Sequence, residues 1–297
     1  MPTAESQTKL YVKRATPDNW VSPDFLRRLQ KNVRVTLFDL KTIILLSGLI
    51  FQQLCCICVF TSCFIYLLWS WVTAGQLALF VTGATLCGFL LWWHSLSPLN
   101  KTLKILATPL HTGLVILTFS TALAPVLHSL LDTVSTDTIY AMTFLFLLLN
   151  WTLSPYGNGM CHRDPVNRDS NVMSLAAGLL ASLCLSSRLS GPWETLVLIL
   201  FATLMFATWP SIAHSFQADA AAAVRLTFTI GLGVLALLSL LPFLLSAEIE
   251  ALYKRFLLLA CVFCGLFFNL GIPWFFYQLQ SAKYNIHGPW DEAIIQR

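Results

Sequence analysis

The residues of this chain that could do chemistry are nine cysteines and a few pairs of acids. Cys55 with Cys58, and Cys261 with Cys264, have the Cys-x-x-Cys spacing of zinc sites and redox centres. Both pairs lie inside long apolar runs, where a thiol behaves as a small hydrophobic side chain. We therefore expect structural packing rather than a metal or redox role. Because Cys161 alone lies in a loop, no disulfide framework is expected.

The acids offer little for catalysis. Adjacent acids are common on solvated loops, so general acid–base catalysis is a weaker interpretation of these pairs than simple exposure to solvent. The chain contains no Gly-rich phosphate loop, no nucleophile elbow and no zinc-type His/Glu pair. We therefore predict no catalytic residue, no metal and no cofactor in this chain. The acid pairs considered are Asp164 with Asp169, Glu248 with Glu250, and Asp291 with Glu292.

The elements that carry these residues are apolar and long. From Thr42 to Asn100 the chain contains no Asp, Glu, Lys or Arg. A membrane-spanning helix needs about 20 mostly apolar residues, so this stretch is long enough for two. Backbone in hydrocarbon must satisfy its own hydrogen bonds, and continuous apolar runs favour helices over a barrel. We therefore predict a helical hairpin, with its turn near residues 72–76.

The whole composition follows the same pattern. Hydrophobic residues make up 57% of the 297, and charged residues only 11%, against about 25% in an ordinary globular protein. We predict an all-α, polytopic transmembrane bundle with a segment at 1–41, a helical domain at 42–280 and a tail at 281–297. The predicted spans are Ile43–Trp69, Leu77–Leu96, Ile105–Leu127, Thr138–Pro155, Asn171–Ser187, Thr195–Ala213, Leu226–Leu245 and Phe256–Leu279.

Charge placement predicts the orientation. With eight spans both termini share a side, and if that side is cytosolic only three of the 18 Lys and Arg residues fall opposite: Arg188, Lys254 and Arg255. This is the positive-inside pattern. No charged residue falls within a predicted span, which argues against an ion-coupled transporter or pump.

The polar residues inside the spans are neutral or weakly ionisable. Side chains of this kind hydrogen-bond between helices in membrane proteins. We expect that role for them, with contact to a substrate as the alternative. They are Gln52, Gln53, His94, His111, Asn150 and Asn269.

The segment before the first span predicts a surface helix. Ser22, Pro23 and Asp24 form a helix-start signal. A basic amphipathic helix just before a span is typical of one lying on the membrane surface. The basic side chains either only set the topology or also attract anionic lipid headgroups, including phosphoinositides. They are Arg27, Arg28, Lys31 and Arg34.

Two further segments have strong local signals. Ser135 or Asp137 can cap the helix that follows it, with a lumenal partner contact as the alternative. Past the last span, Gly288 and Pro289 break the chain before Trp290. This tail is either an interfacial anchor or a docking element for a cytosolic partner. The candidate docking residues are His287, Trp290, Asp291 and Glu292.

These two segments, Ser135–Met142 and Asn285–Ala293, resemble signatures of the C subunit of the phosphatidylinositol N-acetylglucosaminyltransferase complex. The matching motifs are short, but they follow the right order over most of the chain. The others are Pro17-Asp18-Asn19-Trp20-Val21, Phe25-Leu26 with Lys31-Asn32, Gln52-Gln53-Leu54-Cys55 with Cys58-Val59-Phe60, residues 181–189, and Trp209-Pro210.

The resemblance implies a non-catalytic, multi-pass subunit in the endoplasmic reticulum membrane. That complex transfers N-acetylglucosamine from UDP-N-acetylglucosamine to phosphatidylinositol, the first step of glycosylphosphatidylinositol (GPI) anchor synthesis. The implied partners are the other subunits of the complex, its separate catalytic subunit among them, and membrane lipid, with phosphatidylinositol a candidate; no nucleic acid is expected. A small-molecule transporter or lipid scramblase is the alternative, and an independent membrane enzyme is a third hypothesis.

Overall fold

The structure is a computed structural model of the whole chain. It divides the chain into two compact units, Asp39–Phe275 and a second formed by Met1–Phe38 with Phe276–Arg297. The residues that it describes are 30–31, 37–95, 103–131, 133–154, 156, 165–210, 213, 222–246, 250–283 and 286–287.

Each of the eight predicted spans corresponds to a helical segment, so the all-helical prediction is confirmed. Two of these segments contain a turn of π-helix, η3 and η4, and the last ends in a 3₁₀ turn, η5. The helical elements are α1 (Leu40–Leu68), α2 (Ala74–Ser95), α3 (Leu103–Leu130), α4 (Thr136–Leu153), α5 (Pro165–Ser186), α6 (Pro192–Thr203), η3 (Leu204–Thr208), α8 (Ala222–Leu245), α9 (Ala251–Leu266), η4 (Phe267–Gly271), α10 (Ile272–Leu279) and η5 (Gln280–Ala282).

Within the described residues, four helical stretches are long and apolar enough to cross a membrane. Shorter apolar stretches occur in α2, in α5 and from α6 into η3. The prediction of a membrane protein is therefore confirmed, whereas the predicted number of eight spans is not. The four long stretches are Leu40–Leu68, Leu110–Leu127, Ala222–Leu245 and Ala251–Ala282.

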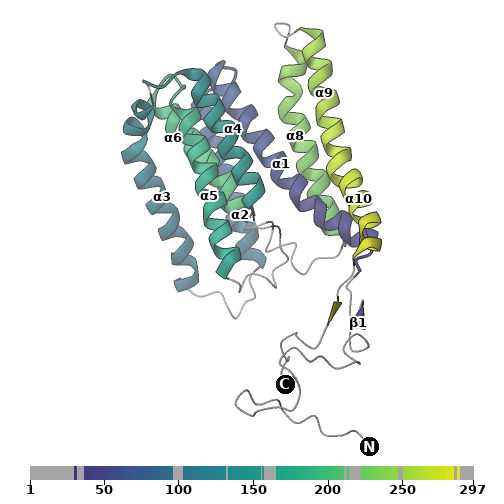
Figure 1. Cartoon of the computed structure of the whole chain (residues 1–297). Helices are drawn as coiled ribbons and strands as arrows, with labels where there is room; N and C mark the ends of the chain where they lie inside the picture. The colour runs from purple at the N-terminus through teal and green to yellow at the C-terminus, as the bar shows by residue number, and fades with distance from the viewer. Residues whose placement is uncertain are drawn as a thin grey trace, which may run out of the picture. The chain divides into compact units, whose positions relative to one another are not determined.

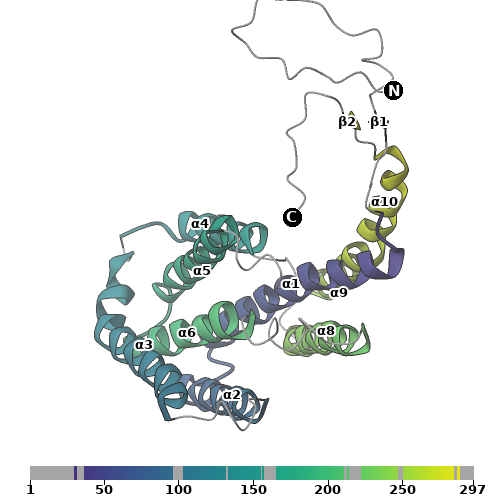
Figure 2. The same ribbon diagram turned by 90° about the horizontal axis from the view of Figure 1, so that it is seen from below.

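Helix α1 is the central element of the larger unit. Figures 1 and 2 show it running between α8 and α9 on one side and the α2–α6 group on the other. It runs in the same direction as α8, because Gln52 bonds Thr229 and, further along both helices, the Tyr66 hydroxyl donates to the Ser239 carbonyl. Helices α4 and α5 form the closest pair in the α2–α6 group.

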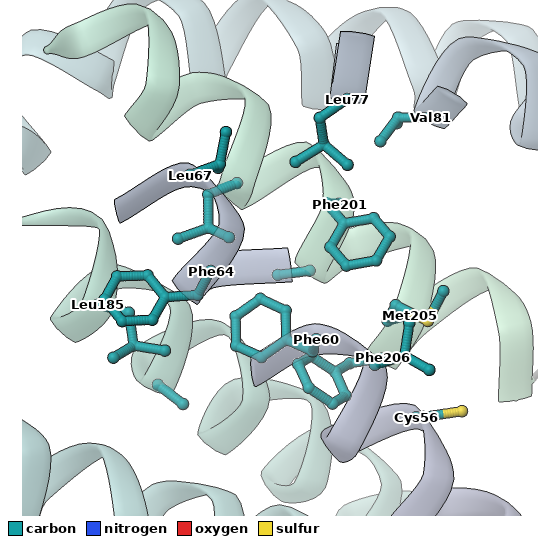
Figure 3. Packing of buried hydrophobic residues seen from close by; sticks show 14 of the residues in the cluster. Cys56, Phe60, Phe64, Leu67, Leu77, Val81, Leu185, Phe201, Met205 and Phe206 are labelled. Carbon is teal, nitrogen blue, oxygen red and sulfur yellow. The ribbon is translucent and has the colours of Figure 1, made fainter. Parts of the chain in front are cut away.

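The hydrophobic core lies where α1 meets α6, η3 and the start of α2. The rings of Phe60 and Phe201 are fully buried, with ring centroids 6.3 Å apart, and Phe206 packs edge-on against Phe60 at 5.1 Å (Figure 3). Cys55 and Cys56 are buried in the same cluster. All the cysteines in the described part of the chain are free thiols, and these two pack as small hydrophobic residues, as the sequence predicted.

The smaller unit joins the two ends of the chain. Strand β1 (Gln30–Lys31) pairs antiparallel with β2 (Ile286–His287), so that Gln30 faces His287. The prediction of a surface helix that continues through Arg34 is therefore wrong at Gln30–Lys31, where pairing with the tail provides the backbone hydrogen bonds. The rest of that predicted helix, with Arg27, Arg28 and Arg34, lies outside the described residues.

Candidate functional site

A buried polar network connects α1, α4 and α5. The Gln53 amide donates to Asn150 Oδ1 at 2.8 Å. Asn150 in turn donates to the carbonyl of Ser174 at 2.8 Å and to its hydroxyl at 3.2 Å, and the Ser174 hydroxyl donates back to the Asn150 carbonyl at 2.9 Å. All three side chains are at least 94% buried. The sequence-based prediction of bonds between helices is confirmed for Gln53 and Asn150.

A second polar contact joins α1 to α8. Gln52 donates to the Thr229 hydroxyl at 2.9 Å, and that hydroxyl donates to the Arg225 carbonyl one turn earlier at 3.0 Å. Gly48 permits this approach, because a Cβ at Gly48 would lie 2.9 Å from the Thr229 hydroxyl. Two adjacent glutamines of α1 thus bond helices on opposite sides of it, which fixes the rotation of α1 in the bundle.

The remaining in-membrane polar residues behave differently. Asn269 donates its amide to the carbonyl of Gly265, in its own helix, at 2.9 Å. His111 is exposed on α3. The side chain of His94 lies outside the described residues. Of these polar residues, Gln52, Gln53 and Asn150 are therefore the ones whose described side chains bond another helix.

A small cavity adjoins the two glutamines, close to the carboxyl ends of α4 and η3. Its volume of about 30 Å³ is sufficient for about one water molecule. Tyr156 lies on its wall and donates its hydroxyl to the Trp151 carbonyl, and burial raises the pKa of that hydroxyl. The cavity is lined by Leu49, Gln52, Gln53, Ser154, Tyr156, Trp209, Pro210 and Ala213.

A larger groove of about 300 Å³ lies between α1, α8 and the end of α9 with η4. Its volume is at the lower bound of small-molecule sites, roughly 300–1,000 Å³. Its lining is apolar apart from Thr229 and Asn269, whose donors are used within the protein. The lining residues are Ile44, Leu45, Gly48, Phe51, Leu226, Thr229, Ile230, Gly233, Gly265, Leu266, Asn269 and Leu270.

The site residues predicted from the sequence lie away from this core. Ser135 is the N-cap of α4, with its hydroxyl accepting from the Thr138 amide at 3.4 Å, and Asp137 lies in the first turn. Lys31 and His287 lie in the two short strands. Trp290, Asp291 and Glu292 lie outside the described residues. Within the described ranges, no three His, Cys, Asp or Glu side chains gather to hold a metal ion.

Sequence reasoning missed the role of Arg188. Its guanidinium donates to the Leu131 carbonyl at 2.5 Å and to the Val134 carbonyl at 3.1 Å, just beyond the end of α3. Cations are favoured near helix carboxyl ends, where carbonyls are left without intrahelical partners. The sequence feature that could have indicated this role is a single basic residue in a short turn between two apolar runs.

The fold and its polar core define a polytopic helical membrane protein assembled around one central helix. The family profile described as phosphatidylinositol N-acetylglucosaminyltransferase, GPI2, matches residues 7–291. The chain belongs to this family.

Curated relatives support the same assignment. The chain is 32% identical to the C subunit of phosphatidylinositol N-acetylglucosaminyltransferase from Bos taurus, and 32% identical to the same subunit of Homo sapiens. Each alignment covers 98% of this chain and 93% of the relative. The Schizosaccharomyces pombe GPI2 subunit is 28% identical, over 96% of this chain and 85% of its own length. No solved structure matches the chain.

Proposed function

We propose that this chain is a non-catalytic membrane subunit of the complex that transfers N-acetylglucosamine from UDP-N-acetylglucosamine to phosphatidylinositol, the first step of GPI anchor synthesis. Its task is to present the lipid substrate and to act as a scaffold for the catalytic subunit. The observation that carries the proposal is the family match over residues 7–291. Names of relatives on both sides of the animal–fungal divide agree with it.

The polar core suits a scaffold. Gln53, Asn150 and Ser174 direct their hydrogen bonds at one another across three helices. Buried polar bonds of this kind fix which helices meet and in what register. A bundle with a fixed register presents a constant outer surface to partner subunits, which is what assembly in the membrane requires.

We propose eight spans with both termini on the cytosolic side of the endoplasmic reticulum membrane. The pairing of β1 with β2 supports this, because it joins segments from before the first span and after the last. Gln280 adds to it by accepting from the Phe38 amide at 2.6 Å and donating to the Phe38 carbonyl at 3.1 Å. Two ends that pair directly must share a side, which requires an even number of spans.

We propose that the tail docks the catalytic subunit or another cytosolic part of the complex. Trp290 is then a buried anchor, flanked by Asp291, Glu292 and His287, because large aromatic side chains dominate interface energies. The basic residues Arg27, Arg28, Lys31 and Arg34 would lie on the same side, where they attract anionic lipid.

The test is a pull-down in mild detergent. The tagged parent chain, Trp290→Ala and Asp291→Ala are each assayed for bound partner subunits and for N-acetylglucosamine transfer to phosphatidylinositol. Trp193→Ala is the matched control, because Trp193 is exposed at the start of α6, which the proposed topology places on the lumenal side.

The parent and the Trp193 variant are expected to retain partners and activity, and the tail variants to lose both. Tail variants that keep their partners and full activity would contradict the docking role. A stable parent chain that brings down no activity would contradict the proposed function, and lipid or solute transport would then be the activity to test.

A further inference from the structure

We propose that the groove between α1, α8 and the α9–η4 segment holds one acyl chain of an anionic glycerophospholipid, with the lipid phosphate at Lys41 and Arg225. The inference deepens the proposed function and rests on it for the identity of the lipid as phosphatidylinositol. The groove and the charges belong to the described structure and do not depend on that assignment.

The shape of the groove suits a hydrocarbon chain. One glycine from each of three helices, Gly48, Gly233 and Gly265, lies on its wall, and the ring of Phe51 forms part of its floor. A Cβ at Gly265 would be 3.7 Å from the Phe51 ring, so the missing side chain opens space beside the ring rather than allowing a backbone contact. Thr229 uses its hydroxyl within the protein, which leaves the wall largely apolar.

The charges lie at one end of the groove. Lys41 is in the first turn of α1 and precedes the lining residues Leu45 and Gly48 by four and seven positions, so it lies on the same helix face. Arg225 precedes Thr229 by four positions and shares its face on α8. The parallel packing of α1 and α8 brings both basic residues to the same end.

The helix termini reinforce these charges. Both α1 and α8 begin at this end, and helix amino termini favour anions. Asp39, the N-cap of α1, is the acid at this end among the described residues. Among the described residues at this end, the two basic side chains of Lys41 and Arg225 therefore outnumber the single acid Asp39. Under the proposed topology this end faces the cytosol, which is also where the sugar nucleotide is expected.

A second lateral groove serves as the comparison. It lies between α1, α4 and α5, at the opposite end of α1, and has a volume of about 470 Å³. Its lining includes Phe64, Trp69, Tyr140 and Phe144. Within the described part of the chain no basic residue lines either groove, but the basic residue closest in the chain to this second one, Arg188, donates to the Leu131 and Val134 carbonyls, and the acid Asp137 lies in the first turn of α4. Charge complementarity therefore selects the groove between α1, α8 and α9 for an anionic lipid, although the other is larger.

The test measures lipid retained by the purified chain. The tagged chain is reconstituted in nanodiscs of phosphatidylcholine with phosphatidylinositol, returned to detergent, and its bound lipid is counted by native mass spectrometry. Gly265→Leu fills the groove. Gly231→Leu is its control, because a Cβ at Gly231 meets nothing within 4 Å. Lys41→Gln and Arg225→Gln remove the charges, with the exposed Arg255→Gln at the far end of the bundle as their control.

The parent and both controls are expected to retain phosphatidylinositol over phosphatidylcholine. Each charge variant is expected to lower that preference about fivefold, the usual effect of one basic residue near an anionic lipid, and Gly265→Leu to reduce retention of either lipid. Equal retention of the two lipids by the parent, or a preference unchanged in the charge variants, would overturn the proposal.

The assay uses the chain alone, so it separates the two claims. A chain that retains phosphatidylinositol but brings down no transferase activity would keep the groove assignment and contradict the proposed function. Gly265→Leu is first checked for a parental melting temperature; if it does not fold, the two charge variants decide the outcome.

Discussion

Asn150→Ala should loosen the contact of α4 with both α1 and α5. The Asn150 side chain makes three hydrogen bonds and is 1% exposed, so no water replaces them. Hydrogen bonds between membrane helices contribute about 0.6 kcal/mol each on average. Leaving the buried Gln53 amide without its acceptor costs about 1–3 kcal/mol more. We therefore expect a loss of about 3–5 kcal/mol in the free energy of unfolding.

The assay is unfolding in mixed micelles by titration with a denaturing detergent, followed by the fluorescence of the ten tryptophans. Thr152→Ala is the matched control, because Thr152 is exposed on the same helix and bonds only the Leu148 and Leu149 carbonyls behind it. The control should change stability by less than about 0.5 kcal/mol. An Asn150→Ala variant as stable as this control would refute the role of the network.

A double-mutant cycle isolates the bond between α1 and α4. Replacing both partners of a buried hydrogen bond by apolar groups of similar size can be nearly neutral. Gln53→Leu with Asn150→Leu should therefore destabilise by less than the sum of the two single changes, with a coupling of about 0.5–3 kcal/mol. Strict additivity would show that the two amides do not interact.

Three other predictions concern packing and the chain ends. Gly178→Ala should destabilise by about 1–3 kcal/mol, because its Cβ would lie 2.8 Å from a buried ring of η3; Gly231→Ala, with open space around it, should be neutral in the same unfolding assay. Arg188→Ala should cost about 1.5–3 kcal/mol by removing its bonds to the end of α3, and an unchanged melting temperature would count against that capping role. Gln280→Ala should speed hydrogen exchange at the Phe38 amide, which mass spectrometry can follow; an unchanged rate would show that this pairing does not protect the amide.

The sequence was sufficient to predict the helices because apolar runs without charges have few other folds in hydrocarbon. It also identified Gln53 and Asn150 as residues that hydrogen-bond between helices, because an amide left unpaired inside the membrane costs free energy. It could not show that Asn269 bonds its own helix, because residue type does not determine which partner a side chain reaches. The packing of each helix against α1 determines the partner.

The errors arose where contacts link residues distant in the sequence. The helix-start signal at Ser22-Pro23 predicts a helix that continues through Arg34, but pairing with the tail at Ile286–His287 places Gln30–Lys31 in a strand. Local propensity cannot anticipate a partner more than 250 positions away. The groove was missed for the same reason, because its glycines become neighbours only when α8 and α9 pack on α1.

The most direct test of the central claim compares the captured complex with the chain by itself. Material bound to the tagged parent chain in mild detergent, and the same chain purified alone, are each given UDP-N-acetylglucosamine and phosphatidylinositol, and the glycolipid product is measured. We predict product from the complex and none from the isolated chain. Product from the isolated chain would show that it is itself a catalyst, and no product from an intact, well-folded capture would contradict its place in the transferase.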